Sequence, residues 1–305
     1  MPTARTPSRR AWTYLQERFP LGAHGPLVAA FAGGVACASA GLRGAAGPGW
    51  PAVGVAVVVS LGAFFQLRVA DEWKDREVDA RVRPERPVPR GLVTLGELAV
   101  AAAAVAVVQI VACLWLTPRL LLPLAGVWGW GALMTVEFGL PERLRQSAAL
   151  TLVSHGLIVP CIDLFSVSAD VLGHGATYPE GTAWLVGVSL FGGMTVEIGR
   201  KVWASADERP GVDTYSADWG RRRALAVWAG VVLASLACGL QVLRAMGTRE
   251  ALGLGLAAGA AGVVALGVGG LWADRPGGGR WVETAAGVWT LGLYLTLGPL
   301  ALWTR

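Results

Sequence analysis

Charged side chains are scarce in this sequence. Asp, Glu, Lys and Arg make up 15% of the 305 residues, whereas a soluble globular protein carries about 25%. Apolar residues make up 54%, and they gather in runs of about twenty, the length that a helix needs to cross a bilayer. The scarcity of charge therefore excludes an ordinary soluble domain and indicates a polytopic membrane protein.

Histidine and cysteine are also rare. Three histidines argue against a histidine-based metal centre. The cysteines lie in separate apolar runs without the spacing of a metal or redox motif, and we interpret them as small buried residues: Cys37, Cys113, Cys161 and Cys238. The first twenty residues are polar and rich in Arg, and they lack the apolar core of a cleavable signal peptide.

Nine apolar runs predict an all-α bundle of about nine transmembrane helices within one domain, residues 21–305. Thr94 and Glu97 have the spacing of a capping box at the start of the third run. The basic segment 1–20 is either an interfacial helix on anionic lipid or a disordered tail. The expected spans are 24–42, 51–70, 95–116, 120–138, 147–168, 181–198, 223–243, 250–272 and 282–303.

Lys and Arg are divided unevenly between the two sides of this topology. Of the 26 basic residues, 21 fall on the N-terminal side and 5 on the other. The positive-inside rule then predicts a cytoplasmic N-terminus. The membrane that we expect is a bacterial-type inner (cell) membrane. The net charge of +5 is explained by topology, and we expect membrane lipid, not nucleic acid, as the partner of the basic residues.

The first polar stretch, DEWKDREVDARVRPERPVPRG, runs from Asp71 to Gly91 directly after the second apolar run. Asp71, Asp75 and Asp79 share one face of a helix, with Glu72 beside them. Carboxylates crowded at a membrane helix end repel one another unless a cation binds them. Mg²⁺ takes oxygen ligands and commonly bridges to a substrate phosphate. The alternative is a solvated loop whose acids pair with its own arginines.

The second polar stretch, EIGRKVWASADERPGVDTYSADWGRRRA, begins at Glu197, where the sixth run ends. Glu197 and Asp207 are further candidates for metal ligands. Arg200 and Lys201 are candidates for diphosphate binding, because cationic side chains form strong charge-assisted hydrogen bonds to phosphate oxygens. The alternative is a helix-end ion pair between Glu197 and Lys201 followed by a solvated loop.

Two lysines occur in the whole sequence, Lys74 and Lys201, one in each polar stretch. Three polar residues inside predicted spans are candidates for lining a substrate cavity: Glu137, His155 and Asp163. A carboxylate buried in a membrane needs a partner, so Asp163 is the hardest of the three to explain as packing. A packed, hydrogen-bonded ring is the alternative for His155.

These residues resemble the UbiA superfamily of membrane prenyltransferases, which is similar in having nine transmembrane helices and two aspartate-rich motifs. Its first motif reads Asn-Asp-x-x-Asp-x-x-x-Asp, followed by Arg-Pro-x-Arg-Pro-x-Pro-x-Gly. Here Asp71 stands at the Asn position and Glu72 at the first Asp position, while Asp75 and Asp79 match. The segment RPERPVPRG, residues 83–91, matches the trailing segment.

The second motif of that family reads Asp-x-x-x-Asp-x-x-x-Asp, followed by Gly-x-x-Thr. The segment GVDTYSADWGRRRA resembles the trailing part, and Asp207 stands at the last Asp position. Trp203 occupies the middle position, and Glu197, Arg200 and Lys201 replace the rest. This departure leaves the number of metal ions and the reaction open.

The resemblance implies Mg²⁺-dependent ionisation of an allylic isoprenoid diphosphate and transfer of the prenyl group to an acceptor that the sequence does not identify. It implies metal binding by Asp71, Glu72, Asp75, Asp79, Glu197 and Asp207. It implies diphosphate binding by Arg83, Arg86, Arg200 and Lys201.

Two alternatives stay open. A membrane terpene cyclase would use the same site without an acceptor. A transporter or lipid-binding protein would be expected to show internal repeats or charge at the midplane, and the sequence has its charge at one face.

Overall fold

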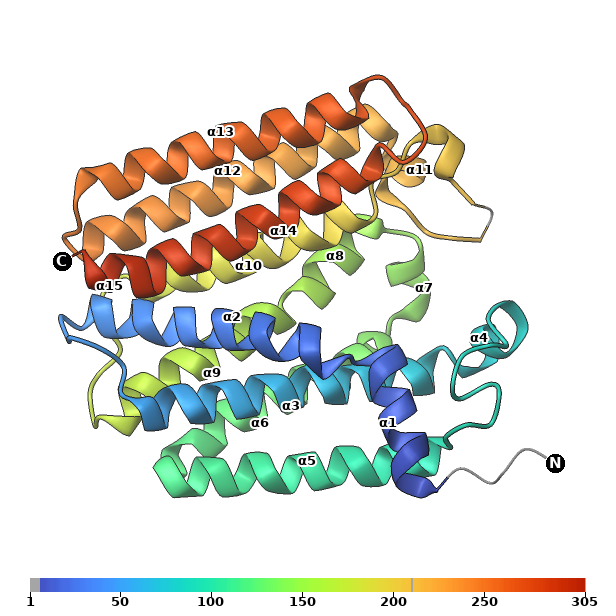
Figure 1. Ribbon diagram of the computed structural model, residues 1–305, viewed down its shortest axis with the longest axis horizontal. Helices are drawn as coiled ribbons and strands as arrows, with labels where there is room; N and C mark the ends of the chain where they lie inside the picture. Colours follow the sequence, from blue (N-terminus) through green and yellow to red (C-terminus); the bar gives the residue numbers. More distant parts are fainter. Residues whose placement is uncertain (1–5, 210, 305) are drawn as a thin grey trace.

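The structure is a computed structural model that describes residues 6–209 and 211–304. These residues form helices joined by turns, with no β-strand among them. Within these described residues, eight helical segments are long and apolar enough to cross a membrane. The chain is therefore an integral membrane protein folded as a polytopic helical bundle (Figure 1).

The eight long segments run from one end of the bundle to the other. They are α2 (Leu21–Leu42), α3 (Trp50–Lys74), α5 (Leu95–Leu116), α8 with α9 (Ala148–Gly156 and Ile158–Gly173), α10 (Thr182–Arg200), α12 (Arg221–Ala245), α13 (Glu250–Trp272), and α14 continued by the π-helical turn η4 and α15 (Gly279–Leu295, Thr296–Leu300 and Ala301–Trp303). The shorter elements are α1 (Pro7–Arg18), α4 (Arg76–Val82), η1 (Pro118–Leu120), α6 (Leu121–Thr135), η2 (Glu137–Gly139), α7 (Pro141–Arg145), η3 (Ser205–Asp207) and α11 (Tyr215–Trp219).

The fourth expected span, 120–138, differs from the others. Its helix α6 has 15 residues, about 22 Å of helix, whereas the hydrocarbon core of a bilayer is about 30 Å thick. Glu137 and Phe138 have positive φ angles of 51° and 53°, and this left-handed backbone ends the helix. α6 nevertheless returns the chain from the end of α5 to the opposite end of the bundle (Figure 1).

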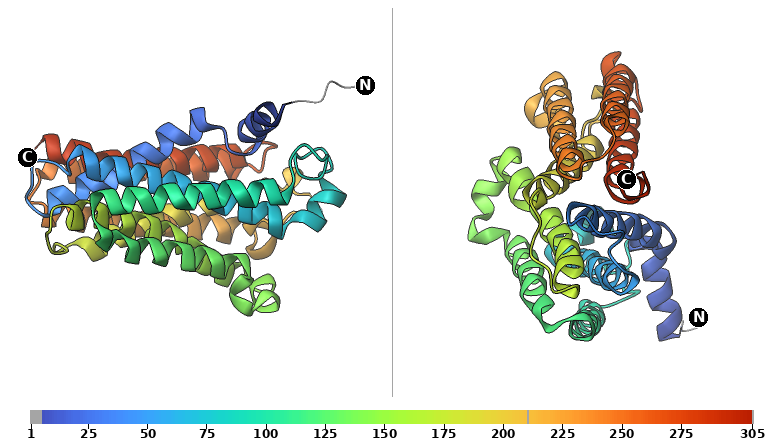
Figure 2. Two further views of the ribbon diagram at one scale, coloured as in Figure 1. Left: turned by 90° about the horizontal axis from the view of Figure 1, so that it is seen from below. Right: turned by 90° about the vertical axis from the view of Figure 1, so that its left-hand side faces the viewer.

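The long helices form two groups (Figures 1 and 2). α3, α5, α6 and α9 surround one apolar core that includes Phe165, and α10, α12, α13 and α14 surround a second that includes Trp228. α2 belongs to both, because Ala32 packs in the first core and Val35 in the second. α2 therefore joins the two groups.

The basic N-terminal segment contains a helix, α1, that docks across the ends of α3 and α5. Tyr14 and Phe19 are buried there, and Arg18 forms an ion pair with Glu72 of α3. Residues 7–18 are thus held against the bundle. Arg5 lies outside the described residues.

The capping box at the start of α5 is confirmed. The Thr94 hydroxyl oxygen accepts a hydrogen bond from the Glu97 backbone N–H at 3.1 Å, and the Glu97 carboxylate accepts one from the Thr94 N–H at 2.7 Å. The short elements α1, α4, α7 and α11 gather at the same end of the bundle (Figure 1). That end carries the connections in which most of the Lys and Arg residues lie.

α2 and the π-helical turn of the last span approach each other backbone to backbone. A Cβ atom placed on Gly298 would lie 2.4 Å from the carbonyl oxygen of Gly34, and one placed on Gly34 would lie 3.0 Å from the carbonyl oxygen of Tyr294. Small residues allow membrane helices to pack this closely. The crossing therefore depends on the absence of a side chain at both glycines.

We predict that Gly298→Ala lowers the thermal midpoint of the protein in detergent, because the methyl group overlaps backbone atoms of α2 that cannot move away. Gly292→Ala is the matched control: it lies on the same span, and a Cβ atom there meets nothing within 4 Å. The control should leave the midpoint unchanged or raise it slightly, since Ala reduces the entropy of the unfolded chain. Equal midpoints for the two variants would contradict the close crossing.

Candidate functional site

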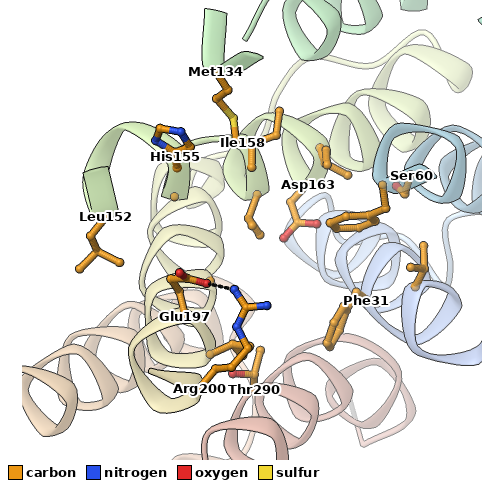
Figure 3. A pocket seen from close by; sticks show the side chains of 18 of the residues that line it. Phe31, Ser60, Met134, Leu152, His155, Ile158, Asp163, Glu197, Arg200 and Thr290 are labelled. Carbon is orange, nitrogen blue, oxygen red and sulfur yellow. Dashed lines mark hydrogen bonds and ion pairs between the residues drawn. The ribbon is translucent and has the colours of Figure 1, made fainter. Parts of the chain in front are cut away.

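A cavity of about 550 Å³ lies between the two helix groups. Its walls come from α2, α3, α6, α8, α9, α10, α11 and α14, and Figure 3 shows many of the side chains that line it. Most of the wall is apolar, as at Phe31, Met134 and Ile158. The basic residues of the lining gather with Asp71 and Glu197 at one end, which we call the mouth.

The mouth is formed by the C-terminal ends of α3 and α10. Asp71 and Lys74 lie in the last turn of α3, and Glu197, Arg200 and Lys201 lie at the end of α10. α3 and α10 run in the same direction and end on the same side of the bundle (Figure 1). The fold therefore brings the two polar stretches together, and both lysines of the chain line the mouth.

The cations at the mouth are positioned by carboxylates. Lys201 Nζ lies 2.8 Å from Glu197 Oε1, and Arg200 Nη2 donates a hydrogen bond to Glu197 Oε2 at 2.6 Å. Lys74 forms an ion pair with Glu137. An anion that enters the mouth thus meets three cationic side chains that are already oriented and partly exposed.

Tyr215, the first residue of α11, completes this side of the mouth. Its backbone N–H donates to the carbonyl oxygen of Lys201 at 2.9 Å, and Lys201 Nζ lies 5.9 Å from the centre of its ring. Burial raises the pKa of the Tyr215 hydroxyl above its ordinary value. The hydroxyl group is therefore harder to ionise than that of an exposed tyrosine.

The four carboxylates of the first polar stretch do not share one site. α3 ends at Lys74, Asp75 interrupts the helix with φ −89° and ψ 3°, and α4 begins at residue 76. Of Asp71, Glu72, Asp75 and Asp79, only Asp71 lines the cavity. In the described part of the chain, no three His, Cys, Asp or Glu side chains are grouped so that they could hold a metal ion.

Two of these four carboxylates are buried, and arginine side chains, in place of the expected metal ion, neutralise them. Glu72 is 2% exposed and accepts a hydrogen bond from Arg18 Nε at 2.5 Å. Asp79 is also 2% exposed, and it is bound by Arg86 at 2.5 Å, with Arg83 at 3.6 Å. Arg83 and Arg86 are therefore engaged by Asp79 and do not line the cavity. The physical reason is that the break at Asp75 separates the two residues: Glu72 on α3 pairs with Arg18 of α1, and Asp79 on α4 pairs with Arg86 in the segment after α4.

Asp207 also lies away from the cavity lining. Its Oδ2 atom accepts a hydrogen bond from the Gly277 N–H at 2.7 Å, which joins the loop after α10 to the turn between α13 and α14. Asp274 makes a second link, because it accepts from the Ser205 N–H at 2.8 Å and pairs with Arg221. The Ser205 hydrogen bond, with help from Arg221, lowers the pKa of Asp274 to about 2. Asp207 thus acts as a loop contact in this structure.

His155 and Asp163 both line the cavity, whereas Glu137 does not. Glu137 Oε2 is 3.5 Å from His155 Nε2, and the same carboxylate holds Lys74. Asp163 is 5% exposed and accepts a hydrogen bond from the Tyr294 hydroxyl at 2.5 Å. Among the ion pairs of the described residues none includes Asp163.

Sequence reasoning did not select several cavity residues: Ser60, Lys74, Tyr215, Thr290 and Tyr294. For Lys74 a signal existed, because it is one of two lysines and lies three residues after Asp71, on the same helix face. For Tyr294 no local signal existed, because its partner Asp163 lies on another helix far away in the sequence.

No protein family model, no curated protein and no solved structure matches the chain.

The Arg18–Glu72 pair gives a test of how α1 is attached. Arg18→Met leaves a buried carboxylate without its counterion, and we expect a loss of roughly 3–5 kcal/mol in stability, measured as a lower unfolding midpoint in detergent. Arg9→Met, at an exposed position of the same helix, should have little effect. The double variant Arg18→Met with Glu72→Met should recover most of the loss. A double variant as unstable as Arg18→Met would contradict the pairing.

Proposed function

We propose that this protein is a Mg²⁺-dependent membrane enzyme that ionises an allylic isoprenoid diphosphate and transfers the prenyl group to an acceptor. One observation carries the proposal: a cationic mouth opens directly onto an apolar cavity of about 550 Å³ inside a membrane bundle. An isoprenoid diphosphate has the matching shape, with a polyanionic head and a hydrocarbon tail. The resemblance of the two polar stretches to the UbiA prenyltransferases supports the same chemistry.

The basic side chains at the mouth would bind the diphosphate. Arg200 and Lys201 offer N–H donors in a partly desolvated site, and Lys74 faces them from α3. Hydrogen bonds from these cations to the leaving oxygen strengthen as that oxygen gains charge, which favours breaking the bond to carbon. Glu197 and Glu137 hold the three cations in place until the substrate arrives.

The residues at the mouth fit a Mg²⁺ ion that binds together with its substrate. Such an ion commonly takes one or two protein carboxylates together with substrate phosphate oxygens and several waters. Asp71 and Glu197 are the two carboxylates that line the mouth, and they would hold it. When bound, the ion would neutralise charge on the diphosphate.

The apolar wall would hold the isoprenoid chain and keep water away from the cation that forms. Ionisation breaks the bond between C1 and the diphosphate oxygen, and the electron pair leaves with the diphosphate. The acceptor then forms a bond to C1 and loses a proton. Aromatic rings on the wall, including Phe31, Phe64 and Tyr294, offer π faces to positive charge.

These aromatic faces also favour the alternative function, a terpene cyclase. Phe31 and Tyr294 pack with their ring centres 5.0 Å apart at the cavity wall. In a cyclase the double bonds of the substrate itself attack C1 and no acceptor is needed. The final cation either loses a proton to form an alkene, or adds water and then loses a proton to form an alcohol.

Orientation and span number belong to the same proposal. The mouth lies at the end of the bundle that carries most of the Lys and Arg residues, so we place it at the cytoplasmic side of an inner (cell) membrane. We also place α6, with its flanking turns η1 and η2, as a ninth crossing, since it connects opposite ends of the bundle (Figure 1).

We predict that Asp71→Asn, Glu197→Gln and Lys201→Met each reduce Mg²⁺-dependent release of diphosphate by about 100-fold or more, because each removes a charge that acts on the departing group. Release would be measured with purified protein in detergent and geranyl, farnesyl or geranylgeranyl diphosphate. Glu142→Gln, at an exposed position on α7, should keep full activity. Full activity in Asp71→Asn and Lys201→Met would refute the proposed site.

The same assay separates the two candidate functions. A cyclic hydrocarbon or alcohol formed without an acceptor would identify a cyclase. Turnover that begins only when an aromatic or other acceptor is added would identify a transferase.

A further inference from the structure

The proposed reaction, whether it ends in a transferred prenyl group or in a ring, releases a proton that some group must take. Among the described residues that line the cavity, four carry a carboxyl group or an imidazole: Asp71, His155, Asp163 and Glu197. Asp71 and Glu197 lie at the mouth, where they face the metal ion, the diphosphate and the basic side chains. The proton is lost from the organic part of the substrate, so a base is needed further inside.

His155 is poorly arranged for this role because both of its ring nitrogens face protein groups. Its Nε2 atom lies 3.5 Å from Glu137 Oε2, and its Nδ1 atom lies 3.2 Å from Ser154 Oγ. Glu137 itself does not line the cavity. Asp163 is therefore the remaining candidate among these four residues.

Asp163 lies deeper in the cavity than the mouth. It is 5% exposed, and Figure 3 shows its side chain pointing into the cavity from α9. Its hydrogen-bonding partner Ser189 precedes Glu197 by eight residues on the uninterrupted helix α10, which corresponds to roughly 12 Å along the axis. With a diphosphate at the mouth, the carbon that attacks C1 approaches from this inner side.

The hydroxyl groups around Asp163 can serve its carboxyl group with or without a proton. The Tyr294 hydroxyl donates to Asp163 Oδ2 at 2.5 Å. Ser189 is a second partner of Asp163, and its Oγ atom also lies 3.1 Å from the carbonyl oxygen of Leu185. A hydroxyl group has one hydrogen to donate and lone pairs that accept. Ser189 can thus donate to the ionised carboxylate, or accept from the protonated carboxyl group while it donates to Leu185.

The surroundings of Asp163 also suit a positive charge on the substrate. Its hydrogen-bonding partners in the described part of the chain are the uncharged Tyr294 and Ser189, and a carboxylate inside a membrane span is costly without a cation. The ring of Tyr294 packs with that of Phe31, their centres 5.0 Å apart, and both line the cavity. A carbocation in the cavity therefore meets a carboxylate and aromatic faces on the same part of the wall.

We propose that Asp163 is the catalytic base, which takes the proton that is lost after the new bond to C1 has formed. The C–H bond beside the cationic carbon breaks, and its electron pair forms a double bond or restores the aromatic ring of an acceptor. The proton binds a carboxylate oxygen of Asp163, and its release to water after the product has left restores the carboxylate. Tyr294 and Ser189 are positioning residues. The inference rests on the proposed function, which supplies the cation.

The first test replaces the carboxyl group by an amide. Asp163→Asn keeps the size of the side chain and an oxygen that accepts from Tyr294, but it cannot take the proton. With Mg²⁺, an isoprenoid diphosphate and an aromatic acceptor where turnover requires one, the variant should still release diphosphate, because the mouth is intact. The yield of wild-type product per diphosphate released should fall by about tenfold or more, since a positioned base contributes roughly 100-fold or more. The simple prenyl alcohol should appear instead.

Asp170→Asn is the matched control, because Asp170 is a buried acid on the same helix that pairs with Arg43 and does not line the cavity. It should lower the thermal midpoint and keep the yield per diphosphate released. An unchanged yield in Asp163→Asn would mean that another group takes the proton, and it would overturn the proposal. Loss of diphosphate release in an Asp163→Asn protein that melts like the wild type would place Asp163 in the ionisation step instead, with the same consequence.

A ligand without a diphosphate gives a readout that is independent of turnover. The probe is an amine of farnesyl length whose tertiary nitrogen, positively charged at neutral pH, replaces a carbon in the middle of the chain. The wild-type protein in detergent should bind it about tenfold more tightly than the matching hydrocarbon, the effect of a hydrogen bond to a charged group. Asp163→Asn should lose this preference, and Glu197→Gln should keep it.

The outcomes separate this inference from the proposed function. Equal affinities of the wild-type protein for the amine and the hydrocarbon would overturn the role of Asp163, and this measurement needs no variant that folds. Diphosphate release by the wild type with an unchanged product yield in Asp163→Asn would refute the base alone. No diphosphate release by the wild type from any of the three isoprenoid diphosphates would refute the proposed function, and the catalytic role of Asp163 with it.

Discussion

A buried carboxylate must be neutralised when it lies in a membrane bundle, and the arrangement of this fold depends on how each one is neutralised. The low dielectric makes an unpaired charge costly, so the partner of each acid decides which segments come together. Glu72 recruits Arg18 and thereby attaches α1 to α3. Asp170 of α9, fully buried, receives two hydrogen bonds from Arg43 at the end of α2, at 2.9 and 2.6 Å. These pairs close opposite ends of the bundle.

Ion pairs between carboxylates and cationic side chains also occur at the mouth of the cavity, but there the side chains are exposed to solvent. Glu197 holds Arg200 and Lys201, but all three side chains are roughly a third or more exposed. Exposed ion pairs contribute little to stability, so these cations can exchange a carboxylate for a phosphate at small cost. The buried pairs therefore serve the structure, whereas the exposed pairs at the mouth are suited to binding an anion.

Local rules accounted for much of the architecture. Hydrophobic run length located the spans, and the Thr94–Glu97 capping box began α5 where its spacing indicated. At α6 the helix is shorter than the expected span 120–138, because left-handed backbone follows at Glu137 and Phe138. The local sequence does not predict this left-handed backbone, since neither residue is a glycine. In this turn the Glu137 side chain pairs with Lys74 and lies 3.5 Å from His155 Nε2.

Hydropathy and spacing act through neighbouring residues, and they were enough to identify a helical membrane protein and to locate the two polar stretches. Which carboxylates face the cavity follows instead from the packing of the helices. Asp71 lines it, while Asp79 turns away to Arg86, although both fit the same helical spacing. The contact of Asp163 with Tyr294 arises in the same way, from two helices that are distant in the sequence. The physical reason is that a buried polar group is satisfied by whatever the packing of distant helices brings within reach, and no local pattern encodes that.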